Sequence, residues 1–338
     1  MDIDRLTGAR RLGLAAGTAA TLTLGLVTVA GPAGATSRTS ASVADDTLTV
    51  EGSFGSDSIA LRLAPGDAGT LQVDFGGDGT PEHSFDRSTF TRIEVFARSG
   101  QDRFRVDQVN GAFADEALTV DGGSGNDTLD GGDGVELFVG GRGDDAVDGN
   151  RGNDTGVLGS GHDSFRWDPG DGSDIVEGDS GTDTLDFNGA GVAETMQLLP
   201  EGGRAVFLRE QATIRMDMDG VEQLDLTALG GTDTMTVEDM TGTDFRQADV
   251  DLQGPAGGPD GAADRVSVNG TPGGDDIDVR TDNGSVEVEG LQTTTNVTGS
   301  EPTDLLQVNG QDGNDDIDVD PAVLALVDVA VDLGPGQL

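Results

Sequence analysis

The sequence predicts an all-β protein: a parallel β-roll of nonapeptide repeats, flanked by irregular parallel β-helix coils. Three observations predict this fold. A nine-residue repeat fills the middle of the chain, related fragments recur at longer intervals on both sides, and no segment after residue 35 has a helical hydrophobic period. We divide the chain into a signal peptide (1–35), a β-helix-like N-terminal region (36–121), the β-roll (122–186) and β-helix-like C-terminal repeats (187–338).

Residues 1–35 have the three parts of an export signal. Arg5, Arg10 and Arg11 precede an apolar, uncharged stretch over residues 12–30, and the small residues 33–35 follow as a cleavage site. A membrane anchor is the alternative, but glycine and threonine dilute the stretch. We therefore expect a secreted, extracellular protein exported by the Sec or the Tat route, with no membrane span after signal removal.

The composition excludes several classes of protein. The 338 residues include 63 Asp and Glu against 19 basic residues, all of them arginine, so the formal net charge is −44. No basic face for nucleic acid can be assembled from this balance. The chain has no cysteine, so it can form neither disulfides nor thiolate metal sites. Gly-rich turns that end in acids would also repel phosphate.

Residues 122–186 form seven nine-residue units, with a two-residue insertion at 167–168. The eighth position is apolar in six units. The sixth position is acidic in all seven: Asp127, Glu136, Asp145, Asp154, Asp163, Asp174 and Asp183. The glycines that we assign to the site precede these acids at the second and fourth positions: Gly123, Gly125, Gly132, Gly134, Gly141, Gly143, Gly152, Gly161, Gly172 and Gly181.

This pattern resembles the RTX, or haemolysin-type, calcium-binding nonapeptide family, whose repeat is G-G-x-G-x-D-x-U-x with U a large apolar residue. The resemblance implies that the acids and glycines named above hold several Ca²⁺ ions. Departures are local: Glu136 has a longer arm, Asn150 replaces a glycine and Gly156 leaves one apolar position empty. Segments within 161–253 also resemble a group of secreted, chiefly actinobacterial proteins described only as calcium-binding.

Elementary geometry supports a metal site independently. A nine-residue unit suits a tight turn followed by a short strand, so two units make one coil and residues eighteen apart lie above one another. Six apolar side chains should then stack into a narrow core: Leu129, Phe138, Val147, Phe165, Val176 and Leu185. Stacked carboxylates about 5 Å apart repel by roughly 3 kcal/mol at an effective dielectric near 20.

Calcium between the turns would reverse that repulsion. It accepts six to eight oxygens in flexible geometry, whereas magnesium demands a tighter octahedron. We therefore expect folding to be coupled to calcium binding. Salt adaptation is the alternative account of the acidity, with few functional calcium sites, but it does not explain acids that recur in a nine-residue frame.

The flanks repeat on a longer period. Residues 268–279 recur at 308–319, and fragments at 52–59 and 100–104 are related to them. Alternating runs such as 71–75 and 285–289 predict strands. We interpret the flanks as coils continuous with the roll, with separate β-sandwich domains as the alternative.

The sequence gives little support for catalysis, and we expect a structural or surface-interaction scaffold. Some β-helix proteins are lyases or epimerases of acidic polysaccharides, which makes such an enzyme the alternative. However, sugar sites favour aromatic platforms, and Trp167 is the chain's one tryptophan, with no tyrosine. His83 and His162 lie in polar contexts, and no catalytic motif accompanies them. A cell-surface or polysaccharide partner fits this expectation.

Overall fold

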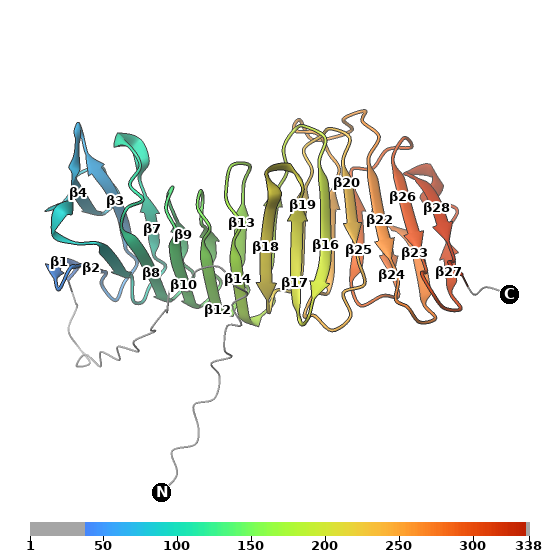
Figure 1. Cartoon of the computed structure of the whole chain (residues 1–338), viewed down its shortest axis with the longest axis horizontal. Coiled ribbons are helices and arrows are strands. Elements are labelled where there is room, and N and C mark those ends of the chain that lie inside the picture. The colour runs from blue at the N-terminus through green and yellow to red at the C-terminus, as the bar shows by residue number, and fades with distance from the viewer. Residues whose placement is uncertain (1–37, 336–338) are drawn as a thin grey trace, which may run out of the picture. The chain divides into compact units, whose positions relative to one another are not determined.

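The computed structural model describes residues 38–335, so the predicted signal peptide lies outside the described residues. The described chain consists of 28 strands in two mostly parallel sheets of fourteen strands each (Figure 1). Four short 3-10 turns complete the regular structure of this part of the chain, at Arg87–Thr89, Gln108–Asn110, Gln211–Thr213 and Val323–Ala325. The prediction of an all-β parallel roll or helix is therefore confirmed.

The first sheet, sheet A, contains the strands in which the second, fourth and sixth units of the repeat end, together with strands of both flanks. In order across the sheet these are β1 (Ser40–Ala44), β2 (Thr47–Glu51), β6 (Arg92–Phe96), β8 (Ala117–Ser124), β10 (Glu136–Arg142), β12 (Thr155–Gly161), β14 (Ile175–Gly181), β18 (Ile214–Asp219), β17 (Arg204–Arg209), β16 (Thr195–Glu201), β20 (Thr234–Val237), β22 (Arg265–Asn269), β26 (Leu305–Asn309) and β28 (Asp328–Asp332).

The second sheet, sheet B, contains the strands in which the first, third, fifth and seventh units end, together with strands of both flanks. Its order is β27 (Asp316–Val319), β23 (Asp276–Asp282), β24 (Ser285–Glu289), β25 (Thr294–Thr298), β21 (Gln247–Asp251), β19 (Gln223–Thr227), β15 (Thr184–Asn188), β13 (Ser164–Trp167), β11 (Ala146–Asp148), β9 (Thr128–Asp130), β7 (Arg103–Val106), β3 (Ser58–Ala64), β4 (Asp67–Phe75) and β5 (His83–Asp86).

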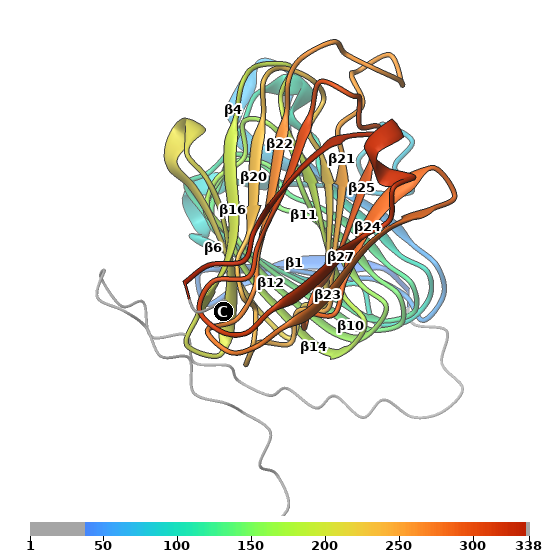
Figure 2. The ribbon, with the colours of Figure 1, turned by 90° about the vertical axis from the view of Figure 1, so that its right-hand side faces the viewer.

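The chain alternates between the two sheets, so one coil contains two nonapeptide units, as predicted. In sheet B, Val147 pairs with Leu129 on one side and with Phe165 on the other, and both pairings are parallel steps of eighteen residues. Figure 2, seen along the stack, shows the coils superposed. Each unit therefore places its sixth residue above its counterpart in the next coil.

The flanks are less regular than the roll. Antiparallel hairpins interrupt the parallel coils where β3, β4 and β5 pair, where β16, β17 and β18 pair, and where β23, β24 and β25 pair. The expected strands at 71–75 and 285–289 lie in β4 and β24, both within hairpins. Asn283 and Gly284 have positive φ angles of 48° and 94°, which suits the two-residue turn between β23 and β24.

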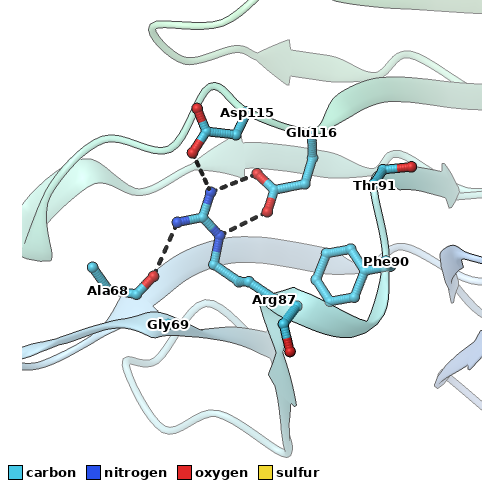
Figure 3. A pocket seen from close by; sticks show the side chains of 8 residues that line it. Ala68, Gly69, Arg87, Phe90, Thr91, Asp115 and Glu116 are labelled. Carbon is cyan, nitrogen blue, oxygen red and sulfur yellow. Dashed lines mark hydrogen bonds and ion pairs between the residues drawn. The ribbon is translucent and has the colours of Figure 1, made fainter.

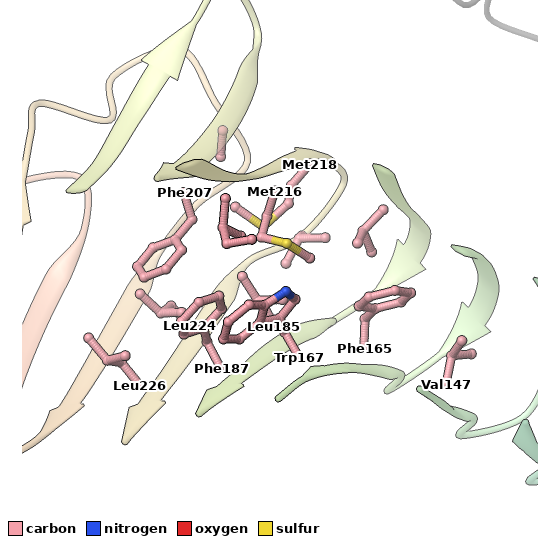
Figure 4. Close-up of a cluster of buried hydrophobic side chains, with 14 of the residues drawn as sticks. Val147, Phe165, Trp167, Leu185, Phe187, Phe207, Met216, Met218, Leu224 and Leu226 are labelled. Carbon is pink, nitrogen blue, oxygen red and sulfur yellow. The ribbon is translucent and has the colours of Figure 1, made fainter. Parts of the chain in front are cut away.

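A continuous apolar core separates the two sheets. The six apolar side chains expected to stack in the roll are all buried, with at most 2% exposure. Trp167 and Phe187 stack with ring centroids 4.1 Å apart, and Phe207 lies 4.5 Å from Phe187 (Figure 4). This aromatic stack fills the core where the regular roll meets the C-terminal coils.

The empty apolar position at Gly156 is filled by its neighbours. A Cβ built on Gly156 would lie 2.8 Å from Cδ2 of Phe165, and Leu158 is fully buried although it occupies a glycine position of the repeat. The two departures from the pattern therefore compensate for one another.

Among residues 38–335, no helix has the length and apolar character needed to cross a membrane.

Candidate metal centre

The sixth-position acids of the roll are buried at the turns where the chain enters each strand. All seven are at most 5% exposed. Asp127, Asp145, Asp163 and Asp183 precede strands of sheet B, whereas Glu136, Asp154 and Asp174 lie at the start of strands of sheet A. The coil thus separates the acids into two columns. Each column runs along the N-terminal ends of the strands of one sheet.

The column at sheet B, here called ladder 1, is joined by hydrogen bonds from backbone to side chain. Each acid's N–H donates to one carboxylate oxygen of the acid in the next coil, at 2.7–2.9 Å. The members of ladder 1 are Asp57, Asp102, Asp127, Asp145, Asp163, Asp183 and Glu222.

The column at sheet A within the roll, ladder 2, follows the same rule. Glu136 N–H donates to Oδ1 of Asp154 at 2.8 Å, and Asp154 N–H donates to Oδ1 of Asp174 at 2.7 Å. The longer arm of Glu136 bends back, so that its Oε2 accepts the N–H of Gly132 at 3.2 Å.

In six members of ladders 1 and 2 these bonds use one carboxylate oxygen and leave the other without a hydrogen-bond partner. Stacked carboxylates were expected only to repel one another, whereas a backbone N–H group donates a hydrogen bond to one oxygen of each stacked aspartate in ladder 1. The buried oxygens without a partner include Oδ2 of Asp102, Asp127, Asp145, Asp154, Asp163 and Asp183. A buried, unpaired carboxylate oxygen is costly, because desolvation has no compensation there.

The glycines bring the backbones of successive turns into direct contact. Gly143 has a φ of 115°, and a Cβ built on it would overlap the carbonyl oxygen of Gly125 in the preceding coil. The site glycines that adopt positive φ are Gly123, Gly125, Gly141, Gly143, Gly152, Gly161 and Gly181, whereas Gly132, Gly134 and Gly172 do not. Backbone carbonyls therefore lie between the turns, close to the acids.

Burial raises the pKa of these carboxyl groups, and neighbouring carboxylates add to the effect. The pKa rises to about 7 for Asp145, Asp174 and Asp183 and to about 9 for Asp154, because burial disfavours the charged form. The pKa rises to about 6 for Glu136, and it is also raised for Asp127 and Asp163. Hydrogen bonds from backbone N–H groups oppose these shifts.

Ladder 1 extends beyond the nonapeptides at both ends. Asp57 and Asp102 precede the roll and Glu222 follows it, and the pKa of buried Asp102 is raised to about 6 by burial. Asp57 and Asp102 could have been found from the fragments at 52–59 and 100–104, because each fragment has a glycine two residues before the acid, as the repeat does. Arg98, with a φ of 81°, stands where the repeat has a glycine, so the segment before Asp102 does not match the repeat pattern.

A third column of acids lies in the C-terminal coils, at the N-terminal ends of strands of sheet A. Its backbone N–H groups donate to carboxylate oxygens at 2.8–3.0 Å, as in ladders 1 and 2. The members of this ladder 3 are Glu194, Asp233, Asp264 and Asp304. These four acids were not predicted as site residues, because their turns lack the regular glycine spacing of the nonapeptides.

In other parts of the structure, arginine side chains form ion pairs with acidic side chains. A hollow of about 360 Å³ contains Arg87, which donates to both oxygens of Glu116 at 2.7 Å and to the carbonyl of Ala68 at 2.9 Å (Figure 3). Because these donors are occupied, Arg87 acts as a clamp between segments. No ion pair within residues 38–335 involves any of the seven sixth-position acids of the roll.

The donor set fits a hard cation held jointly by side chains and backbone. In the described part of the chain, no three His, Asp or Glu side chains form a ready-made metal cluster. Each candidate position instead offers unpaired carboxylate oxygens from stacked acids, with carbonyls of the glycine turns beside them. Oxygen donors of this kind suit calcium.

Comparison with known proteins gave no match to a family model, to a curated protein or to a solved structure.

Proposed function

We propose that this chain is a secreted, haemolysin-type calcium-binding scaffold whose folding is coupled to Ca²⁺. The observation that carries the proposal is the series of buried Oδ2 atoms without a partner on successive coils, at Asp127, Asp145, Asp163 and Asp183. Each of these atoms belongs to the sixth position of a nonapeptide. They supply oxygen donors at regular intervals along the N-terminal ends of the strands of sheet B.

Charge balance supports this proposal. Consecutive members of ladder 1 bring carboxylates close together, so Asp127 and Asp163 both raise the pKa of Asp145, after the larger effect of burial. No arginine pairs with these acids among the described residues. A divalent ion would supply the missing positive charge, and Asp145, Asp163 and the neighbouring glycine carbonyls would hold it.

Calcium suits the donors better than magnesium does. A site built from a few carboxylates and backbone carbonyls has no preset octahedron, and calcium tolerates that irregularity. Binding would offset the cost of burying the acids, so stability and calcium occupancy should rise together.

A non-catalytic role accords with the placement of the aromatic residues. Trp167, the chain's one tryptophan, is fully buried, stacks on Phe187 and donates its Nε1–H to the carbonyl of Gly172 at 2.8 Å. It therefore offers no platform for a sugar ring. We propose that the calcium-stiffened coils act as a spacer or as an interaction surface outside the cell, with a cell-surface or polysaccharide partner.

Calorimetric titration of the metal-free protein with calcium and with magnesium tests the proposal. We expect several calcium ions per chain, weak or no heat with magnesium, and fewer ions in Asp145→Asn. Asp115→Asn is the matched control, because its exposed carboxylate has only a 3.5 Å contact with Arg87. The proposal fails if wild-type protein binds no calcium, or if Asp145→Asn and the control bind as much as wild type.

A further inference from the structure

Ladder 3 is the third column of buried acids and lies outside the nonapeptide repeats. Its members precede strands β16, β20, β22 and β26 of sheet A. They belong to the C-terminal coils, and ladder 3 shares no residue with ladders 1 and 2. The two ends of ladder 3 differ from its middle in how their charge is compensated.

Both ends of ladder 3 are satisfied within the protein. Glu194 forms a buried ion pair with Arg209, and its Oε2 accepts the N–H of Ala190 at 2.7 Å. Asp304 accepts N–H groups on both oxygens, from Asp264 at 3.0 Å and from Glu301 at 2.6 Å. Neither end has an unmet need for a cation.

The middle of ladder 3 lacks such compensation. Asp233 is 2% exposed, and its Oδ1 accepts the N–H of Glu194 at 2.8 Å, but its Oδ2 has no partner. Asp264, 3% exposed, is the next acid in the column and accepts the N–H of Asp233 at 2.8 Å. No ion pair within residues 38–335 involves Asp233 or Asp264, and Arg209 is already bound to Glu194.

The turn before Asp233 has the backbone features of the roll turns. Leu229, Gly230 and Gly231 all have positive φ, at 63°, 100° and 127°. A Cβ built on Gly231 would overlap backbone atoms of Val192, so this turn also lies in backbone contact with the preceding coil. Asp260 brings a further acid to the turn, since its Oδ2 accepts the N–H of Gly231 at 3.0 Å.

We propose that Asp233 and Asp264, together with backbone oxygens of the turn 229–233, bind a divalent cation of the calcium class at a site separate from the roll. Two adjacent buried carboxylates, one with an unpaired oxygen, need a positive charge that the protein does not supply. A hard cation with oxygen ligands meets that need. Because this site uses no residue of the roll, it goes beyond the proposed function.

Equilibrium dialysis of the full chain against radioactive calcium tests the inference. We expect Asp233→Asn and Asp264→Asn each to bind at least one calcium ion fewer than wild type. Asparagine keeps the Oδ1 acceptor of each ladder bond, and circular dichroism in calcium checks that the variants fold. Asp239→Asn is the matched control, because its carboxylate only accepts turn N–H and O–H groups from Thr241.

Asp145→Asn, measured alongside, separates this inference from the proposed function. If Asp145→Asn loses calcium while both ladder 3 variants bind as wild type does, the separate site is refuted and the proposed function stands. If none of the three loses calcium, both fail. Amide exchange gives a further check: calcium should slow exchange over 229–234 less in Asp233→Asn than in wild type, and equal slowing in the two proteins refutes the site.

Discussion

The backbone N–H of Asp145 donates to Oδ1 of Asp163 at 2.7 Å, although the two residues are eighteen positions apart. The same bond links Asp127 to Asp145 at 2.8 Å. Each aspartate is therefore both a donor to the next coil and an acceptor from the previous one. The arrangement fixes Oδ1 of each of these aspartates and leaves its Oδ2 without a hydrogen-bond partner.

Replacing one aspartate of ladder 1 by asparagine should reduce the stabilisation that calcium gives and should stabilise the calcium-free protein. Asp145→Asn keeps the acceptor for Asp127 N–H and removes a buried charge, so we expect a gain of about 1–3 kcal/mol in the free energy of unfolding in chelator. In calcium the gain should vanish, because an ion ligand is lost. Urea denaturation with and without calcium measures both effects, and a loss of stability in chelator would contradict the account.

Adding a methyl group at a stacked turn should be costly. Gly143→Ala places a Cβ against the carbonyl of Gly125 at a φ of 115°, and we expect a loss of about 3 kcal/mol or more. Gly170→Ala is the control, because Gly170 has a φ of 126° but nothing within 4 Å of its built Cβ. That control should cost only about 1–2 kcal/mol. Equal losses in thermal denaturation would show that the turns are not in contact.

The aromatic stack should carry a large share of core stability. Phe187→Ala removes a fully buried ring between Trp167 and Phe207, and we expect a cost of about 3–5 kcal/mol. Phe54→Ala is the matched control, since that ring is 54% exposed and should cost less than about 1 kcal/mol. Denaturation in calcium followed by Trp167 fluorescence compares the two variants. A small effect of Phe187→Ala would mean that the ring is not packed as described.

Acid should stabilise the calcium-free protein. Burial raises the pKa of Asp145 to about 7 and that of Asp154 to about 9, from an ordinary 3.8, so the folded state binds more protons than the unfolded state. The free energy of unfolding therefore falls as pH increases. This stabilisation is complete below about pH 4 and is lost as pH rises through about 7 to 9.

Urea denaturation of metal-free protein at about pH 5 and about pH 8 measures this dependence. We expect the lower pH to give the higher midpoint, and a smaller difference between the two in Asp145→Asn. A midpoint that rises with pH in the metal-free protein would rule out raised carboxyl pKa values.

The nine-residue frame allowed much of this fold to be predicted. It places Val147 between Leu129 and Phe165 in sheet B, and it places the acids in two columns, because one coil contains two units. The hairpins of the flanks were not predicted, since an alternating strand such as 285–289 looks the same in parallel and antiparallel pairings.

The nine-residue frame predicted that the sixth-position acids stack, but it did not predict the hydrogen bonds that join them. Charge and spacing alone could not show that a backbone amide occupies one oxygen of each carboxylate. Asp102 escaped assignment because Arg98 adopts a positive φ where the repeat has glycine. Asp233 escaped because its turn begins with Leu229, which also adopts a positive φ.

The compactness of the protein with and without calcium tests the central claim most directly. Small-angle X-ray scattering and far-ultraviolet circular dichroism of the purified chain should show a compact β-structure in calcium and a looser, less stable fold with less β-structure in excess chelator. Magnesium should not restore the compact form. If the chain in exhaustive chelator has the same scattering radius and the same spectrum as in calcium, the acidic ladders do not need a cation and the account is contradicted.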